Sequence, residues 1–233
     1  MNLNNFNSLI ELFFYQSEKQ DPKSIFLEWL NPNNKKIYTW EETTLNIFKL
    51  SKILKETVKD GDRCLLVSEN RPEWFISDLA IMLANAITVP AYTTYTEDDY
   101  KYLIEDSEPS IVIVSNNEML NKLKKTINEK DFIKKVITFE KIEKAHNDLN
   151  EDDKNRYLDF NSIIKNDLSE KDKIKNLNLK RTSPACIIYT SGTGGNPKGV
   201  ILSHGGILNN LVGACEIMKP LIDTRPIFLT WLP

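Results

Sequence analysis

The residues best suited to chemistry form one glycine-rich stretch, YTSGTGGNPKG, from Tyr189 to Gly199. Three glycines, Gly192, Gly194 and Gly195, allow the backbone to adopt positive φ angles and to approach a ligand closely. Successive backbone N–H groups can then converge on phosphate oxygens. The other polar members add hydroxyl groups and one positive charge: Thr190, Ser191, Thr193 and Lys198. The stretch therefore predicts a binding site for a polyphosphate.

Two better-known phosphate-binding loops do not fit these residues. A Walker A loop requires Gly-Lys followed by Ser or Thr, but Lys198 stands between Pro197 and Gly199. A dinucleotide-binding fingerprint requires Gly-x-Gly-x-x-Gly at the start of a helix, and Pro197 occupies the third glycine position. A plain surface hairpin remains the alternative, because Gly, Ser, Thr, Asn and Pro are also ordinary turn residues.

An alternation of strands and helices must position this stretch. Short apolar runs predict strands at Arg63–Ser68, Ile87–Val89, Ile111–Val114, Lys135–Phe139 and Ala185–Tyr189. Helices are predicted between them at Pro72–Asn85, Glu97–Asp106 and Met119–Asn128. Such an alternation is typical of an α/β fold, in which helices cover both faces of a mostly parallel sheet.

Similar patterns predict the elements on either side. The first residues predict an amphipathic helix whose apolar face carries Phe6, Leu9, Ile10, Phe13 and Phe14. A hairpin of Ile25–Trp29 and Ile37–Tyr38 follows, and a capping box of Thr39 and Glu42 predicts a helix from Trp40 to Val58. After the glycine-rich stretch, the predicted elements are a strand at Val200–Leu202, a helix at His204–Lys219 and a strand at Ile227–Leu232.

Residues 139–182 differ from the rest, because Lys, Asp, Glu and Asn dominate and apolar anchors are few. They predict a polar connector within the domain, with one short helix around Leu158, Phe160, Ile163 and Ile164. His146 lies in this charged run and is predicted to be a surface residue. His204 is predicted to begin a helix rather than to act in catalysis. Core or sheet-edge packing is predicted for Trp40, Trp74, Tyr92 and Tyr95.

Composition narrows the class of protein. The 233 residues are 41% hydrophobic, which suits one large domain or two small ones. The 30 Lys and Arg are interspersed with 33 Asp and Glu, so neither nucleic acid nor an anionic surface is indicated as a partner. Three cysteines far apart in the sequence indicate neither a disulfide framework nor a zinc site. Without a signal peptide or a spanning segment, we expect a cytoplasmic protein.

The string YTSGTGGNPKGVILSH resembles the signature of the acyl-adenylate-forming superfamily, which includes acyl-CoA synthetases. The usual form has Thr-Thr-Gly where this chain has Thr193-Gly194-Gly195, so Gly194 removes one hydroxyl and keeps the backbone donor. The resemblance covers almost the whole chain and is strongest to long-chain and bubblegum-type acyl-CoA synthetases, which carry Pro-x-Tyr-x-Thr as in Val89–Thr96. Asn85 departs from the family pattern, since a glycine is common there.

The resemblance implies a long-chain fatty acid–CoA ligase that uses ATP, Mg²⁺ and CoA. A fatty carboxylate attacks the α-phosphorus of ATP to give acyl-AMP and pyrophosphate, and the thiol of CoA then displaces AMP. The glycine-rich stretch would hold the β- and γ-phosphates and stabilise charge on the leaving pyrophosphate. Backbone donors come from Gly192, Gly194 and Gly195, hydroxyl groups from Thr190, Ser191 and Thr193, and positive charge from Lys198. No catalytic residue or metal ligand is assigned within this chain.

The family also uses an adenine-binding segment, a ribose-binding Asp and a Lys of a C-terminal domain, and none of these is found here. We therefore expect residues 1–233 to form an incomplete N-terminal AMP-binding domain that is inactive alone. Two alternatives stay open: a ligase for another carboxylic acid, and a non-catalytic relic or half of a split enzyme that pairs with a separately encoded C-terminal half. Contact of the first helix with a membrane surface also stays open, because fatty acids are lipids.

Overall fold

The computed structural model describes residues 2–31, 35–142, 155–173, 175, 178–190, 196–222 and 227–230. The strands within these ranges are β1 (Ile25–Trp29), β2 (Lys36–Thr39), β3 (Arg63–Val67), β4 (Ile87–Ala91), β5 (Ile111–Val114), β6 (Lys135–Thr138), β7 (Tyr157–Asp159), β8 (Pro184–Thr190) and β9 (Lys198–Ser203). The α-helices are α1 (Leu9–Ser17), α2 (Trp40–Lys55), α3 (Pro72–Leu83), α4 (Glu97–Ser107), α5 (Asn117–Glu129), α7 (Phe160–Ile163) and α8 (His204–Ile222), and the 3₁₀ helices are η1 (Leu3–Asn5) and η3 (Glu170–Lys173).

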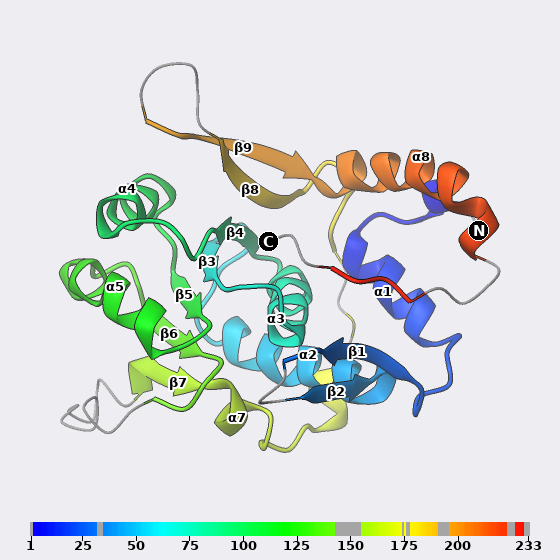
Figure 1. Ribbon diagram of the computed structural model, residues 1–233, viewed down its shortest axis with the longest axis horizontal. Helices are drawn as coiled ribbons and strands as arrows, with labels where there is room; N and C mark the ends of the chain where they lie inside the picture. Colours follow the sequence, from blue (N-terminus) through cyan, green and yellow to red (C-terminus); the bar gives the residue numbers. More distant parts are fainter. Residues whose placement is uncertain are drawn as a thin grey trace.

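The central sheet has the strand order β7-β6-β5-β3-β4-β8-β9, and β1 and β2 form a separate antiparallel hairpin. Every pairing from β7 to β8 is parallel, whereas β8 and β9 are antiparallel. Figure 1 shows α4 and α5 on one side of this sheet and α1 to α3 on the other. The predicted α/β fold, with a mostly parallel sheet covered on both faces, is confirmed.

The two faces of the sheet carry separate apolar clusters. Alternate residues of a strand point to opposite faces, so Leu66 and Ile113 pack with α1, α2 and α3, while Leu65 and Val112 pack with α4 and α5. Short strands that are apolar on both faces are typical of a sheet buried between helices.

The apolar face of α1 lies in the core. Ile10, Phe13 and Phe14 are buried, and Phe14 stacks on Phe48 of α2 at 5.2 Å between ring centroids. The predicted amphipathic helix is confirmed, although Phe6 precedes it. Because these side chains pack inside the protein, they are not available to a membrane surface. None of the described helices combines the length and apolarity needed to cross a bilayer.

Two expectations need correction. The polar stretch 139–182 contains its predicted short helix, α7, with Phe160 and Ile163 buried, but it also contributes an unexpected strand, β7, which pairs with β6 in the register Val136–Tyr157. A three-residue strand among charged residues carries too little pattern to be predicted.

Residues 227–230 were expected to start a strand, but they pair with no strand in the described part of the chain, and Ile227 is fully exposed. His146 lies outside the described residues, as do Trp231 and Leu232.

The backbone conformation at the end of α3 explains why Asn85 can stand where the family commonly has a glycine. This residue adopts φ = 57°, the left-handed conformation that favours glycine and that Asn tolerates better than most residues. Its carbonyl accepts a hydrogen bond from the Gly61 backbone at 2.8 Å, which fixes the turn into β4. A glycine commonly found here in the family suits the same backbone conformation.

The start of α8 is attached to the first residues of the chain by Arg181. Its guanidinium donates hydrogen bonds to the carbonyl oxygens of Leu3 and Phe6, at 3.3 and 2.7 Å, and to Asn209 Oδ1 at 2.7 Å. Leu208 of α8 is buried against the side chains of Leu3 and Phe6. Residues 2–9 are therefore tied to an element about 200 positions later in the sequence.

His204 begins α8, as predicted. The imidazole is buried, and its Nδ1 accepts a hydrogen bond from the Leu9 backbone at 3.3 Å. Burial lowers the pKa of His204 to about 4. The imidazole is therefore neutral at physiological pH and serves as a structural acceptor.

We expect replacement of Asn85 to depend on the backbone conformation of this site. Asn85→Ala and Asn85→Gly both remove the side-chain amide, but only Ala meets the steric penalty of positive φ. The Ala variant should be about 1 kcal/mol less stable than the Gly variant in urea unfolding. Equal stabilities of the two variants would contradict the left-handed conformation.

The buried His204 also predicts a pH dependence of stability. The unfolded chain takes up a proton on this imidazole near pH 6.5 and the folded chain only near pH 4. Stability should therefore fall as the pH falls from 6.5 to 4, by roughly 2–3 kcal/mol from this group. His204→Asn keeps an acceptor that does not titrate, so the variant should lose this part of the pH dependence. Identical pH profiles of the two proteins in urea unfolding would refute the assignment.

Candidate functional site

The glycine-rich stretch joins β8 to β9 at the carboxyl end of β8 (Figure 1). The Cα atom of Thr190 lies opposite that of Lys198, and Tyr189 lies opposite Gly199. Thr190 and Lys198 are both exposed at the start of the connection. The other predicted phosphate-contacting residues lie outside the described residues, so their roles stay predictions: Ser191, Gly192, Thr193, Gly194 and Gly195.

A strand, not a helix, follows the glycine-rich stretch. Walker A and dinucleotide-binding loops both lead directly into a helix, whereas Lys198 starts the antiparallel strand β9. The geometry therefore agrees with the exclusion of both loops on residue grounds. A plain surface turn would also form a hairpin. The residues around the hairpin must therefore distinguish a binding site from a plain turn.

A cavity of about 660 Å³ lies beside the two stems of this hairpin, between them and α4. Its volume falls within the range of roughly 300–1,000 Å³ that is typical of ligand pockets. Its walls combine tyrosine rings, carboxylates and the stem residues: Tyr92, Tyr95, Asp98, Asp99, Tyr102, Leu103, Ile188, Tyr189, Thr190, Asn196 and Pro197. The glycine-rich stretch thus borders a concave, partly aromatic surface, which favours ligand binding over a plain surface turn.

Three of the four aromatic residues expected to pack do so, since Tyr95 packs against the apolar cluster shared with α4 and α5. Trp40 and Trp74 pack against the core as predicted. Tyr92 is half-exposed and, with Tyr95, lines the cavity, their ring centroids 5.5 Å apart. Both tyrosines lie in Val89–Thr96, the segment that carries Pro-x-Tyr-x-Thr and continues from the end of β4. That strand lies beside β8, so the segment and the hairpin emerge from the same edge of the sheet.

One carboxylate of the cavity has a structural role. Asp99 accepts a hydrogen bond from the Thr96 backbone at 2.9 Å, and hydrogen bonds from the Thr96 side chain and then its backbone lower the pKa of Asp99. This carboxylate therefore caps α4. The described ranges contain no group of three or more His, Cys, Asp or Glu side chains arranged to hold a metal ion.

Two of the three thiols are unsuited to nucleophilic chemistry. Cys64, Cys186 and Cys215 are free, and Cys64 is fully buried. Burial raises the pKa of Cys64 far above its usual range, and burial followed by the charge of Asp78 raises the pKa of Cys186 to about 11. Such thiols stay protonated at neutral pH and do not act as nucleophiles.

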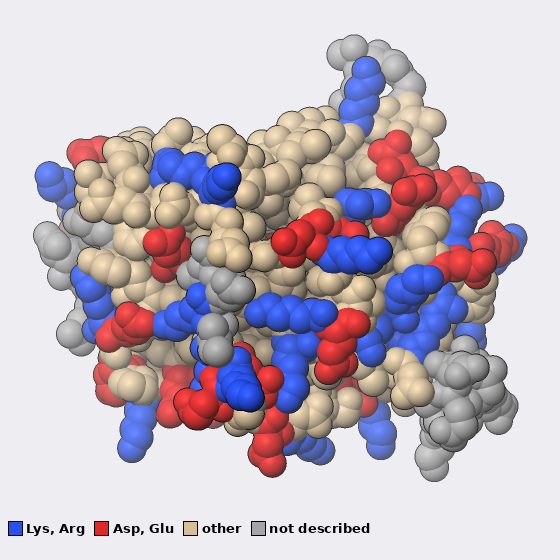
Figure 2. Space-filling model, turned by 180° about the vertical axis from the view of Figure 1, so that it is seen from behind, with Lys and Arg blue, Asp and Glu red and all other residues tan. Residues whose placement is uncertain are grey.

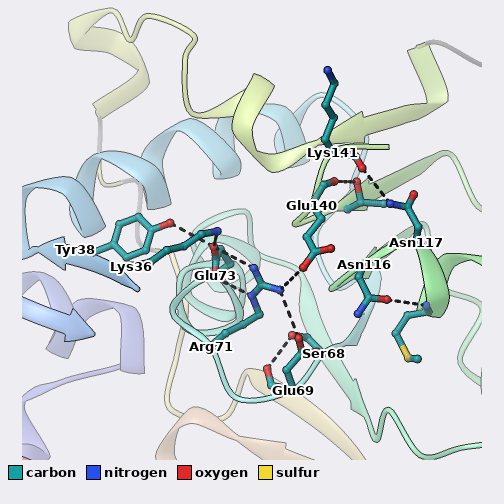
Figure 3. Close-up of polar contacts among 12 residues, drawn as sticks. Lys36, Tyr38, Ser68, Glu69, Arg71, Glu73, Asn116, Asn117, Glu140 and Lys141 are labelled. Carbon is teal, nitrogen blue, oxygen red and sulfur yellow. Dashed lines mark hydrogen bonds and ion pairs between the residues drawn. The ribbon is translucent and has the colours of Figure 1, made fainter. Parts of the chain in front are cut away.

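Sequence reasoning missed a buried charged cluster at the carboxyl end of β3 (Figure 3). The side chains of Arg71 and Glu73 are fully buried, and Arg71 Nε donates to Glu73 Oε2 at 2.9 Å. Lys36 and Tyr38 of β2 also reach Glu73, and Tyr38 Oη lies 3.4 Å from Glu73 Oε1. Burial alone would raise the pKa of Glu73, but the hydrogen bond and charge of Arg71, with those of Lys36, hold it below its usual value.

The cluster is a structural connection. The Arg71 guanidinium also lies 4.4 Å from the centroid of the Trp29 ring and 3.4 Å from Glu140 Oε1. It therefore links the β1–β2 hairpin to the ends of β3 and β6. The Arg-Pro-Glu sequence at the start of α3 was the available signal, because it places two opposite charges beside a buried strand.

Gly199 shows how tightly the second stem packs on the first. A Cβ atom at this position would lie 2.8 Å from Ile187 Cγ2 and 3.3 Å from Tyr189 Cζ. We expect Gly199→Ala to destabilise the protein by about 1–3 kcal/mol in urea unfolding, because these side chains must move. The control is Gly213→Ala in the interior of α8, where nothing lies within 4 Å. This variant should instead gain about 0.5–1 kcal/mol, and equal effects of the two would contradict the packing.

Comparisons with known proteins agree with this architecture. The long chain acyl-CoA synthetase 4 of Arabidopsis thaliana is 30% identical over 200 residues, which are 84% of this chain and 30% of that protein. Long-chain-fatty-acid–CoA ligase 5 of Rattus norvegicus is 27% identical over 176 residues, or 72% of this chain and 25% of that protein. The chain thus spans less than a third of the length of these relatives.

Solved structures show the same fold at low identity. The anthranilate CoA ligase AuaEII in complex with anthranoyl-AMP matches 88% of this chain and 36% of its own, with a TM-score of 0.71 and 19% identity. The luciferase-like enzyme from the mealworm Zophobas morio matches 88% of this chain and 44% of its own, with a TM-score of 0.71 and 20% identity. Residues 14–233 match the family described as AMP-binding enzyme. The chain therefore belongs to the AMP-binding enzyme family.

Proposed function

We propose that this chain supplies the ATP-phosphate-binding part of a long-chain fatty acid–CoA ligase. The observation that carries the proposal is the position of the glycine-rich stretch, on a hairpin that borders a cavity at the carboxyl edge of the sheet. Relatives named long-chain acyl-CoA synthetases support the choice of acid. The Pro-x-Tyr-x-Thr segment adds support, because its Tyr92 and Tyr95 line the same cavity.

In the proposed reaction, the carboxylate of the fatty acid forms a bond to the α-phosphorus of ATP. The bond between this phosphorus and the bridging oxygen breaks, and pyrophosphate leaves with the electron pair. Backbone N–H groups of the glycine-rich stretch and the ammonium group of Lys198 would bind the β- and γ-phosphates and stabilise the charge that develops there. The thiol of CoA then replaces AMP and gives the thioester. Mg²⁺ enters the proposal only as the partner of ATP.

A further polypeptide segment is part of the proposal. Figure 2 shows few charged residues along the upper part of the molecule, where β9 and α8 lie. Five large apolar residues are exposed on these two elements: Val200, Ile201, Val212, Ile217 and Leu221. Exposed apolar surface on this scale is typical of a face that another part of a protein covers. We propose that a further part of the ligase, encoded in the same chain or separately, covers it.

The proposed place of action is the cytoplasm. Its support is the presence of three free cysteines, since thiols persist where the compartment is reducing. Attachment to a membrane through α1 has no support, because the apolar face of that helix packs against α2 and α3.

The proposal predicts that the chain binds ATP through its β- and γ-phosphates. In calorimetric titrations with MgATP, Lys198→Ala should weaken binding about tenfold, because a charge-assisted contact is lost. AMP lacks these phosphates, so Lys198→Ala should leave any binding of AMP unchanged. Lys219→Ala removes an exposed charge elsewhere and serves as the control. Absence of ATP binding, or equal weakening for ATP and AMP, would refute the proposal.

A further inference from the structure

Helix α4 contacts both stems of the glycine-rich hairpin. Tyr102 Oη donates a hydrogen bond to the carbonyl oxygen of Pro197, at 2.9 Å, just before β9. Tyr189 Oη, at the end of β8, donates to the carboxylate of Asp106. The Tyr102 and Tyr189 rings meet edge to face, with centroids 6.4 Å apart and an interplanar angle of 88°. One helix thus holds the residues on either side of the connection.

The spacing on α4 matches the spacing of the stems. Tyr102 and Asp106 are four residues apart, so they lie on the same face of the helix, roughly 5–6 Å apart. Neighbouring strands of a sheet lie about 5 Å apart. Two adjacent positions on one helix face can therefore each reach one stem.

Tyr189 remains the donor of the hydrogen bond to Asp106. Tyr189 is buried, and burial followed by the hydrogen bond and charge of Asp106 raises its pKa well above the usual range. The phenol therefore keeps its proton and remains a donor at any working pH. Asp106 is exposed at the last turn of α4, and its carboxylate accepts this hydrogen bond.

The sheet supports β8, whose Ala185 and Tyr189 are buried, more than it supports β9. Strand β8 pairs with β4 through one register pair, Thr88 and Cys186. Strand β9 is at the edge of the sheet, and its residues Lys198 to Ile201 are exposed. Figure 1 shows the hairpin extending away from the other strands, with α4 below its far end. Helix α4 therefore adds one hydrogen bond to each stem beside the cavity.

We propose that Tyr102 and Asp106 are positioning residues that hold the two stems of the glycine-rich stretch in the geometry required for phosphate binding. They contact Pro197 and Tyr189, on either side of the stretch. The effect on phosphate binding rests on the proposed function. The contacts between α4 and the stems do not, so they can be tested without a ligand.

A first experiment measures the hairpin alone. Hydrogen exchange followed by mass spectrometry reports on the amides of residues 196–200. Tyr102→Phe and Tyr189→Phe should each speed this exchange about tenfold, because removal of one hydrogen bond makes local opening easier. Tyr100→Phe is the matched control. It removes the same hydroxyl group from the same helix, but that hydroxyl donates to the Tyr92 carbonyl, 2.7 Å away, and not to the hairpin.

A second experiment measures binding with inorganic tripolyphosphate as the probe. Tyr102→Phe and Asp106→Leu should raise the dissociation constant several-fold, whereas Asp106→Asn keeps an acceptor and should restore most of the affinity. Thermal unfolding is recorded for every variant. If Tyr102 and Asp106 only stabilise the fold, each variant should lose affinity in proportion to its fall in melting temperature. Tyr100→Phe should then follow the same relation.

The outcomes separate this inference from the proposed function. If the unmodified chain fails to bind tripolyphosphate, the proposed function fails, and the exchange experiment still decides whether α4 holds the stems. If exchange at residues 196–200 is unchanged in Tyr102→Phe, or rises equally in Tyr100→Phe, the positioning role is wrong. If binding is normal but Asp106→Leu and Asp106→Asn behave alike, the role of Asp106 is wrong.

Discussion

The site depends on the parallel pairing of β4 with β8. This pairing joins Thr88 to Cys186 and brings together two segments that are about 100 residues apart in sequence. Because parallel strands end at the same edge of a sheet, the tyrosine-containing segment after β4 and the glycine-rich stretch after β8 emerge side by side. The cavity exists only because of this juxtaposition. The antiparallel turn into β9 then keeps the stretch at the edge rather than burying it under a helix.

Local patterns predicted most of the fold. The capping box at Thr39 and Glu42 forms with both of its hydrogen bonds, and Pro72 occupies the first turn of α3. These features depend on neighbours within a few residues, so they can be recognised in the sequence. Strand β7 could not be recognised in this way, because its pairing with β6 and not its own three residues makes it a strand.

The candidate site differs from most of the fold in this respect. Thr190 and Lys198 lie opposite each other on the two stems, and the phosphate contacts that their motif predicts stay predictions. The cavity and the contacts from Tyr102 and Asp106 were missed. These side chains meet the hairpin across 95 and 83 positions, and only the folded sheet sets such distances. The charged cluster of Arg71 and Glu73 was missed likewise, because burial distinguishes it from an ordinary surface ion pair.

The attachment of the first residues to α8 has a consequence for synthesis of the chain. Leu9 meets its hydrogen-bond partner His204 across 195 positions. At translation rates of roughly 5–20 residues per second, the early segment waits about 10 to 40 s before that partner is made. During this interval Leu3 and Phe6 lack the apolar surface of Leu208 that later covers them. The nascent chain therefore presents a short apolar segment that chaperones can bind.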